Sequence, residues 1–544
     1  MSRPNPAYLI GFALVIVAAM GGAVLLKGGI YISKHEGDTL HLLEIVLRMA
    51  QGETPHEDFL TPIGYLAFAP ISLFVAQGLG FAMAFTLAQI LVALMILPAA
   101  VWTSYTRLNG ALAFLFTAFV MVLPLALVHG QSEQSISLSM HYNRFAWALA
   151  FITIALATLP ALRRDSQSVD GAIIGLAMGV LAMMKITYFI CFAPPILIAL
   201  IMRKQTRAIL AGLAGGAVVA LLSTLYGGFD FWAAYVGDLL TVIGSGVREA
   251  PSAPLNEVAA SSAYITATVA ALLGIIFLRQ SREAVGGVVM LLLFPAFLYV
   301  TYQNFGNDPQ WVWLLAVLLL TLRPAADVVN GWGWNMRQGL TVVAIVALTT
   351  GAPSFLNLLF SPFRHMSEDV TTFTPLLSRA PQHADLQIYD VRAFRMNFNV
   401  DAEGVGQTYR VREDRTSEDD LSLLKGETLP YCEVTLGMVT WMETLATSLE
   451  EEGFAKGNAL FITDLLPGLW MYSDGLKPTQ DSAPWYYGGL PGFEKADYVL
   501  VPLCPISARM RGTVLRALEA RGSDDLVEVF RNDLYIVLKR AGGA

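Results

Sequence analysis

The chain has 544 residues, of which 55% are hydrophobic and only 14% are charged. A water-soluble domain carries roughly 25% charged residues, so this composition excludes an ordinary soluble protein. The formal net charge of -8, without a basic patch interleaved with aromatic residues, gives no basis for nucleic-acid binding.

The hydrophobic residues are concentrated in the N-terminal part of the chain. Residues 1–363 contain a series of apolar runs, many of them close to the roughly 20 residues that a helix needs to cross a hydrocarbon core. Residues 364–544 are mixed and charged. The sequence therefore predicts a mainly α-helical, polytopic membrane domain followed by a soluble domain.

Twelve apolar spans are predicted along the membrane domain. Lysines and arginines of short loops favour the cytoplasm, and their alternation places the N-terminus inside and the soluble domain outside. Because twelve crossings would return the C-terminus to the cytoplasm, a thirteenth is predicted between Leu108 and Arg144, where Pro124 would divide one span into two. The spans are Tyr8–Lys27, Pro62–Ala76, Phe81–Ser104, Leu108–His129, Asn143–Leu162, Gly171–Met184, Thr187–Met202, Ala208–Tyr226, Ala263–Leu278, Val285–Tyr302, Trp311–Leu322 and Gln338–Phe360.

The loop between the first two spans, residues 28–61, concentrates acidic and imidazole groups beside the membrane. Carboxylates next to hydrocarbon are costly to desolvate and titrate abnormally, so such a cluster is a candidate functional site. Its ionisable members include Glu36, Asp38, His41, Glu44, Glu53, His56, Glu57 and Asp58.

A short amphipathic helix is predicted inside this loop. Asp38-Thr39 has the form of an N-cap, and apolar residues from Leu40 onward supply one side. Glu44 and Arg48 lie on the other side and are spaced as an i,i+4 pair. The pattern is typical of a helix that lies on the membrane surface.

The soluble domain is predicted to be α/β. Residues 433–452 and 507–521 have helical patterns, 459–463 and 498–502 have strand patterns, and 527–538 is typical of a hairpin. The domain lacks a phosphate-binding glycine loop and a Gly-x-Ser-x-Gly motif, so no catalytic role is predicted for it. Cys432 and Cys504 permit a disulfide if this domain is extracytoplasmic.

Several short motifs lie in the acidic loop and in the spans after it. Glu36-Gly37-Asp38 stands where the loop emerges, GETPHEDFLTPIGYL spans Gly52 to Leu66, and HYNRFAWAL and MMKITYF begin at His141 and Met183. In this order they resemble the C-type superfamily of integral-membrane glycosyltransferases. The likeness of layout covers nearly the whole chain and is greatest to bacterial transferases that add one sugar to a lipid, polysaccharide or protein.

The resemblance implies a reaction and a place for it. The donor would be a sugar on a polyprenyl-phosphate carrier in a bacterial-type inner membrane, the acceptor a glycan, lipid or protein, and the transfer periplasmic and inverting. Deprotonating the acceptor hydroxyl needs a base, and Asp38 is the residue assigned to that role; its alternative is a structural N-cap. Glu36, beside it, is assigned to substrate binding.

A second polar group, His56 to Asp58, stands at the mouth of the next span. His56, Glu57 and Asp58 would orient the acceptor, hold a divalent cation together with Asp38, or form a solvated loop. No metal ligand set is assigned, and a divalent cofactor stays open.

Two cations occur at the ends of later spans. Lys185 and Arg144 are assigned to the polyprenyl phosphate, with Tyr142 and Asn143 adding hydrogen bonds; the alternative is that the cations anchor their helices at the interface.

A transporter or flippase of a lipid-linked or small-molecule substrate is the main alternative function. It predicts ionisable residues near mid-membrane and paired broken helices in two halves. This sequence places its charges at the outer surface instead.

Overall fold

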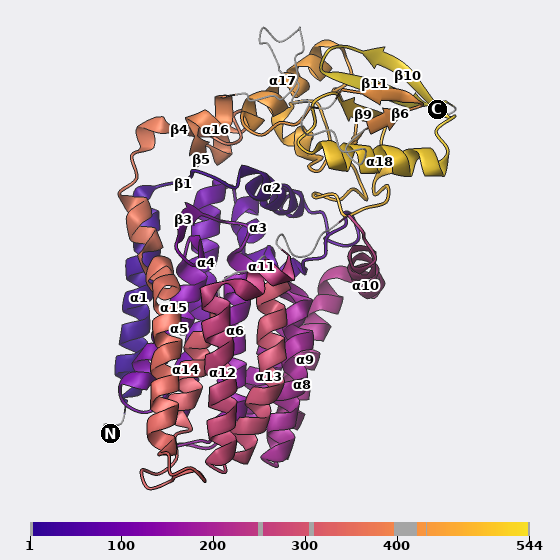
Figure 1. Cartoon of the computed structure of the whole chain (residues 1–544). Coiled ribbons are helices and arrows are strands. Elements are labelled where there is room, and N and C mark those ends of the chain that lie inside the picture. Colours follow the sequence, from indigo (N-terminus) through magenta and orange to yellow (C-terminus); the bar gives the residue numbers. More distant parts are fainter. Residues whose placement is uncertain (1–3, 248–253, 304–308, 396–421, 431, 542–544) are drawn as a thin grey trace.

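The computed structural model describes residues 4–247, 254–303, 309–395, 422–430 and 432–541. A long helical bundle carries a smaller domain containing a β-sheet at one end (Figure 1). The first bundle helix begins at the opposite end, where the loop that joins the last two bundle helices also lies (Figure 1).

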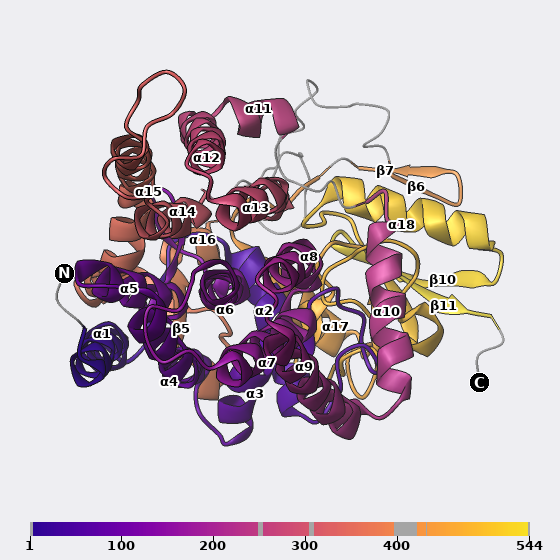
Figure 2. The ribbon, with the colours of Figure 1, turned by 90° about the horizontal axis from the view of Figure 1, so that it is seen from below.

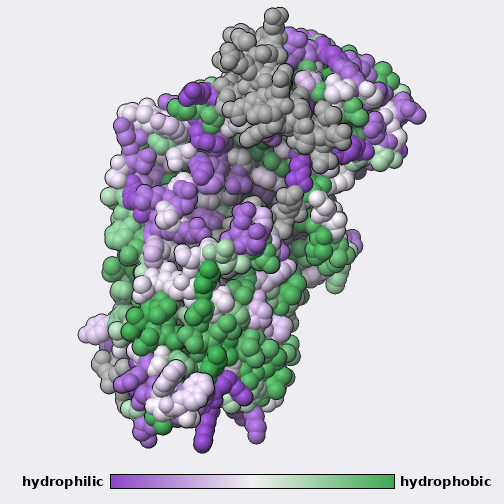
Figure 3. Space-filling view, viewed as in Figure 1, coloured by the Kyte–Doolittle hydropathy of each residue, from purple (hydrophilic) through white to green (hydrophobic). Residues whose placement is uncertain are grey.

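The bundle is that of a multi-pass membrane protein. Figure 3 shows hydrophobic side chains gathered over its lower part, between hydrophilic surfaces at its two ends. Seven described helices are long and apolar enough to cross a membrane: α1 (Pro6–Lys27), α4 (Phe81–Arg107), α7 (Gln167–Met184), α9 (Thr206–Gly227), α12 (Ser262–Gln280), α13 (Ala284–Gln303) and α15 (Met336–Met366). Shorter helices complete it: α5 (Ala111–Leu125), α6 (His141–Thr158), α8 (Ile186–Met202) and α14 (Trp311–Thr321).

Helix α6 lies in the middle of the bundle when it is viewed along its axis (Figure 2). Nearly all of its residues are buried, because neighbouring helices cover every side of it. At the centre of the bundle its first turn, which contains Tyr142 and Arg144, reaches the end that carries the C-terminal domain. We name this the outer end after the orientation predicted from the sequence.

Two predicted crossings are wrong. Pro62–Ala76 forms only a 3₁₀ turn (Tyr65–Ala67) and α3 (Ala69–Ala76), and eight helical residues extend about 12 Å, far less than a hydrocarbon core of about 30 Å. Most of its apolar residues are buried against protein, although Leu73 is exposed. The thirteenth crossing is replaced by a hairpin of β2 (Val128–Gly130) and β3 (Glu133–Ile136) after α5. The other eleven predicted spans coincide with bundle helices.

Three further helices lie at the outer end of the bundle: α2 (Glu36–Ala50), α10 (Asp230–Ile243) and α11 (Leu255–Ala260). Helix α2 begins at Glu36, so the predicted N-cap at Asp38 is wrong; the capping position is His35, in a left-handed conformation with φ 69°. Helix α2 was predicted to lie on the membrane surface, but the C-terminal domain covers Glu44 and Arg48 on its polar side.

The C-terminal domain is α/β, as predicted. Its main sheet has the strand order β10 (Leu526–Arg531), β11 (Tyr535–Arg540), β9 (Tyr498–Pro502), β8 (Leu460–Ile462). Helices α17 (Met438–Glu451) and α18 (Ala508–Arg521) pack on opposite faces, since alternate residues of β9 join different hydrophobic clusters. A hairpin of β6 (Ser422–Leu424) and β7 (Glu427–Leu429) lies against α18, and Cys432 and Cys504 form a disulfide.

A second, three-stranded sheet crosses the boundary between the two domains. β1 (Ile30–Ile32), which follows α1, pairs in parallel with β5 (Leu386–Tyr389), and β4 (Phe373–Pro375) pairs on the other side of β5. The short α16 (Asp390–Phe394) follows β5. The acidic loop, residues 28–61, which we call the outer loop, is therefore built into the C-terminal domain by backbone hydrogen bonds, and the domain covers the outer end of the bundle.

Candidate functional site

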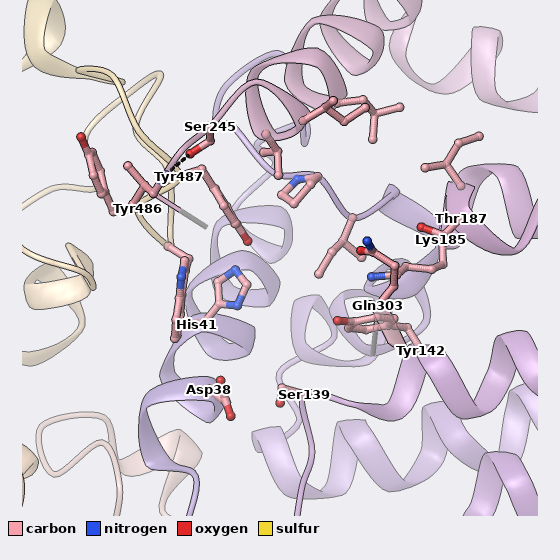
Figure 4. A pocket seen from close by; sticks show the side chains of 18 of the residues that line it. Asp38, His41, Ser139, Tyr142, Lys185, Thr187, Ser245, Gln303, Tyr486 and Tyr487 are labelled. Atoms are coloured by element: carbon pink, nitrogen blue, oxygen red, sulfur yellow. Dashed lines mark hydrogen bonds between the residues drawn. The ribbon is translucent and has the colours of Figure 1, made fainter. Parts of the chain in front are cut away.

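A cavity of about 660 Å³ lies between the outer end of the bundle and the C-terminal domain. Helix α2, the junction of α7 and α8, α10 and the C-terminal domain all contribute walls (Figure 4). Its polar and aromatic lining residues include Asp38, His41, Ser139, Tyr142, Lys185, Thr187, Ser245, Tyr299, Gln303, Trp485, Tyr486, Tyr487, Ser507 and Arg509.

Asp38 enters this cavity from the first turn of α2. Its side chain is 47% exposed, and Nδ1 of His35 lies 3.9 Å from its Oδ2 atom. The surrounding walls raise the pKa of the Asp38 carboxyl group above its ordinary value, because enclosure disfavours the charged form; His35 opposes this shift. A carboxylate with a raised pKa is a stronger base than one in water, which suits proton abstraction.

Lys185 lies on the opposite side of the cavity from Asp38 (Figure 4). It occupies the single extended residue between α7 and α8, where the chain ends one helix and starts the next. Its Nζ atom is 5.2 Å from the centroid of the Tyr142 ring, a cation–π contact. Of the predicted substrate-binding residues, these two line the cavity with Asp38.

Glu36 lies outside the cavity. Its carboxylate is buried and receives a bidentate interaction from Arg392, with Nη2–Oε1 at 2.6 Å and Nε–Oε2 at 2.9 Å. Both oxygens are occupied by a residue of the C-terminal domain. Glu36 therefore joins the domains, and the assignment of Glu36 to substrate binding is corrected.

His56, Glu57 and Asp58 also lie outside the cavity lining. His56 is buried with φ 76°, and its Nδ1 atom is 2.8 Å from Oδ2 of Asp238 on α10. Asp58 accepts a hydrogen bond from the backbone of Thr54, and Glu57 is exposed. The segment fixes the loop to α10, which replaces the predicted role in orienting the acceptor.

Arg144 and Asn143 are buried in the bundle. Nη1 of Arg144 donates to the carbonyl oxygens of Val128, at 2.9 Å, and Ser137, at 3.4 Å. Asn143 donates to the sulfur of Met140. Arg144 therefore holds the β2–β3 hairpin, and its predicted contact with phosphate is corrected.

The geometry of the cavity is the basis for assigning a function. No family model, curated protein or solved structure matches this chain.

A divalent-cation site has little support from the cavity. Asp38 is the one carboxylate among the described lining residues. Within the described part of the chain, no group of three or more histidine, cysteine, aspartate or glutamate side chains is placed to hold a metal ion. Hard cations prefer several oxygen ligands, which a single carboxylate does not supply.

The C-terminal domain supplies cavity residues that the sequence reasoning missed. Trp485, Tyr486 and Tyr487 form an aromatic segment on its lower face, and Arg509 lies in the first turn of α18. The signal was the run Trp485-Tyr486-Tyr487, three adjacent aromatic residues in a region without a strand pattern. His41 of α2 was noted in the acidic loop but given no role, and its ring lies 5.5 Å from that of Trp485.

Proposed function

We propose that this protein is a membrane glycosyltransferase that moves a sugar from a polyprenyl-phosphate donor to an acceptor at the outer face of the membrane. One observation carries the proposal: Asp38 and Lys185 line the same cavity at the outer end of a multi-pass bundle. A base and a cation across one cavity are the two groups that such a transfer requires.

The donor lies on the bundle side of the cavity in this proposal. The apolar lining residues Ile190 and Ile243 are 61% and 79% exposed on the surface of the protein, where they suit a hydrocarbon chain. Lys185 then pairs with the phosphate at the head of that chain. Tyr142 restrains the ammonium group through its ring.

The acceptor lies on the domain side. Trp485 and Tyr487 offer aromatic surfaces, and Ser507 and Arg509 offer polar groups. The Asp38 carboxylate takes the proton from the acceptor hydroxyl, and the oxygen of that hydroxyl bonds to the anomeric carbon. The bond from that carbon to the phosphate breaks, and the polyprenyl phosphate leaves with the electron pair beside Lys185. A single displacement of this kind inverts the anomeric centre.

The test is transfer by the purified protein in nanodiscs, supplied with labelled polyprenyl-phosphate hexoses and pentoses and with an extract of envelope glycans and lipids. We expect release of polyprenyl phosphate, and a loss of at least about a hundredfold in rate in Asp38→Asn, because the base is removed. The transfer rate should also decline as the pH is lowered. The decline should begin at a higher pH than for an ordinary aspartate, because the raised pKa of Asp38 causes the base to be protonated there.

Asp369→Asn is the matched control. Asp369 is exposed, and its side chain accepts a backbone hydrogen bond from Thr371 that asparagine retains. Transfer at the wild-type rate by Asp38→Asn would contradict the assignment of the base. Flux of a lipid-linked sugar across liposomes without release of polyprenyl phosphate would instead support a transporter.

A further inference from the structure

His35 lies between Asp38 and the β2–β3 hairpin. Its Nδ1 atom is 3.9 Å from Oδ2 of Asp38, and its Nε2 atom is 3.3 Å from Oγ of Ser135 on β3. The backbone of His35 is left-handed, with φ 69°, which is uncommon for a residue other than glycine. Strained conformations of this kind persist where the surroundings determine them, and they cluster at functional sites.

The hydrogen bonds of Ser135 determine which nitrogen of His35 carries the proton. Its hydroxyl donates to Oε1 of Glu133 at 2.8 Å, and its backbone N–H donates to the same oxygen at 3.1 Å. A hydroxyl has one hydrogen, so the Ser135 oxygen acts as acceptor toward His35, whose Nε2 carries the proton. In a neutral imidazole the other nitrogen has a lone pair, so Nδ1 faces Asp38 as a proton acceptor.

We propose that His35 receives the proton that Asp38 takes from the acceptor hydroxyl, which makes His35 a positioning and proton-accepting residue behind the base. This proposal rests on the proposed function. The proton moves from the acceptor oxygen to Asp38 and then to Nδ1 of His35, and Asp38 is again ionised. The imidazolium keeps its Nε2–H bond to Ser135, which is bound to the carboxylate of Glu133. Glu133 is 47% exposed, so the proton can then pass to water on that side.

The charges around His35 suit this transfer. Asp38 and Glu36 on α2 and Glu133 on β3 favour the imidazolium, whereas Lys34 opposes it. A protonated His129 of β2 would also oppose it, because the two charges are alike. Burial is the largest influence and lowers the pKa of His35, while enclosure raises that of Asp38. The two pKa values therefore approach each other, which favours proton exchange between the two groups.

The decisive variant is His35→Gly, because glycine adopts the left-handed conformation without strain and leaves space for a small molecule. We expect transfer to slow by on the order of tenfold to a hundredfold, with the affinity for polyprenyl phosphate unchanged. Added imidazole should restore the rate, because it accepts a proton at the vacated position. Pyrazole has the same shape but is far less basic, and it should not.

Ser135→Ala keeps His35 in place and removes its link to Glu133. We expect a few-fold slower transfer near neutral pH and a displaced pH profile, since the imidazolium loses a stabilising partner. His383→Asn is the control, because His383 lies in the C-terminal domain away from the cavity. Bound polyprenyl phosphate reports that each variant is folded.

A wild-type rate and pH profile in His35→Gly would overturn the relay, as would a loss that imidazole does not restore or that pyrazole restores equally well. If Asp38→Asn loses transfer while His35→Gly keeps it, the relay fails and the proposed function stands. If the wild-type protein transfers no sugar from any donor, both fail together.

Discussion

The two halves of the outer loop have similar compositions and different surroundings. In the first half, residues 35–41, Asp38 and His41 open onto the cavity. In the second half, residues 48–61, Arg48 binds Glu53 and the C-terminal domain, His56 binds α10, Asp58 binds the backbone of Thr54, and Glu57 is exposed. Acidic and imidazole groups therefore open onto the cavity at Asp38 and His41 and anchor the loop elsewhere, as Glu36 does in the first half through Arg392. The difference comes from elements remote in sequence.

Arg48 shows how completely the second half is anchored. Its side chain is fully buried, with Nε 2.5 Å from Oε2 of Glu53 and Nη1 2.8 Å from Oγ of Ser482. The carbonyl oxygens of Asp58 and Thr479 accept its remaining hydrogen bonds, each at 3.1 Å. One guanidinium thus joins the end of α2, Glu53 and Asp58 to the C-terminal domain.

The largest expected effect is therefore that of Arg48→Met. The substitution keeps the apolar volume but removes the guanidinium that binds the Glu53 carboxylate and one hydrogen bond from each of the carbonyl groups of Asp58 and Thr479. We therefore expect a loss of about 3–5 kcal/mol in the free energy of unfolding. Urea unfolding of the C-terminal domain of the whole protein in nanodiscs, followed by tryptophan fluorescence, measures this loss.

Arg531→Met is the control for Arg48. Arg531 also binds two carboxylates, those of Glu427 and Glu528, but all three side chains are partly exposed. Exposed ion pairs contribute about 0–1 kcal/mol, so this variant should unfold nearly as the wild type does. Equal effects of the two substitutions would contradict the anchoring role of Arg48.

Glu44 gives the next largest effect, and it depends on pH. Burial raises the pKa of its carboxyl group to about 7, although Arg48 and the indole of Trp470 oppose the shift. Since the folded protein then holds a proton that the unfolded chain has lost, the stability contributed by Glu44 should fall by roughly 3 kcal/mol as the pH rises from about 4.5 to 7.

Glu44→Gln tests this dependence. Glutamine stays neutral and still accepts the hydrogen bond of Trp470, so the difference in unfolding free energy between variant and wild type should grow in favour of the variant as the pH rises through that range. Glu451→Gln, on the exposed side of α17, is the control. A difference that stays constant with pH would show that Glu44 is ionised throughout.

The membrane character and most of the helices were predictable from the sequence. Runs of apolar residues report a helix in hydrocarbon directly, because each crossing must be apolar along its length. The crossing predicted at Pro62–Ala76 was wrong because apolar residues that pack on protein have the same hydropathy as those that face lipid. The β8, β9 and β10–β11 patterns succeeded because each is local and ends at clear turn residues.

The candidate site was predictable only in part. Asp38 and Lys185, which both line the cavity, stand out in the sequence because an ionisable residue beside a membrane span is rare and costly. Whether such a residue faces a cavity or a partner depends on contacts across hundreds of residues, such as Glu36 with Arg392, which periodicity does not report. The same limit hid Trp485 and Arg509, whose place at the cavity depends on how the C-terminal domain packs on the loop.

Lys185 and Arg144, two cations at helix ends of the bundle, differ in the same way: one lines the cavity and the other is buried against protein. Lys185 lines the cavity, and its neighbour there is the ring of Tyr142. Arg144 is buried against the carbonyl groups of the β2–β3 hairpin.

Lys185→Met should weaken binding of polyprenyl phosphate about ten- to a hundredfold, or roughly 1.4–2.8 kcal/mol, because the phosphate loses its counter-charge. Arg144→Met should instead leave the affinity of the folded protein unchanged and lower its melting temperature, since the hairpin loses its donor. Titration of each variant in nanodiscs with a polyprenyl phosphate, next to a neutral polyprenol, separates binding of the charge from binding of the chain. If Lys185→Met and Arg144→Met lose affinity equally, the phosphate lies between the two cations and the cavity extends deeper into the bundle than its lining residues indicate.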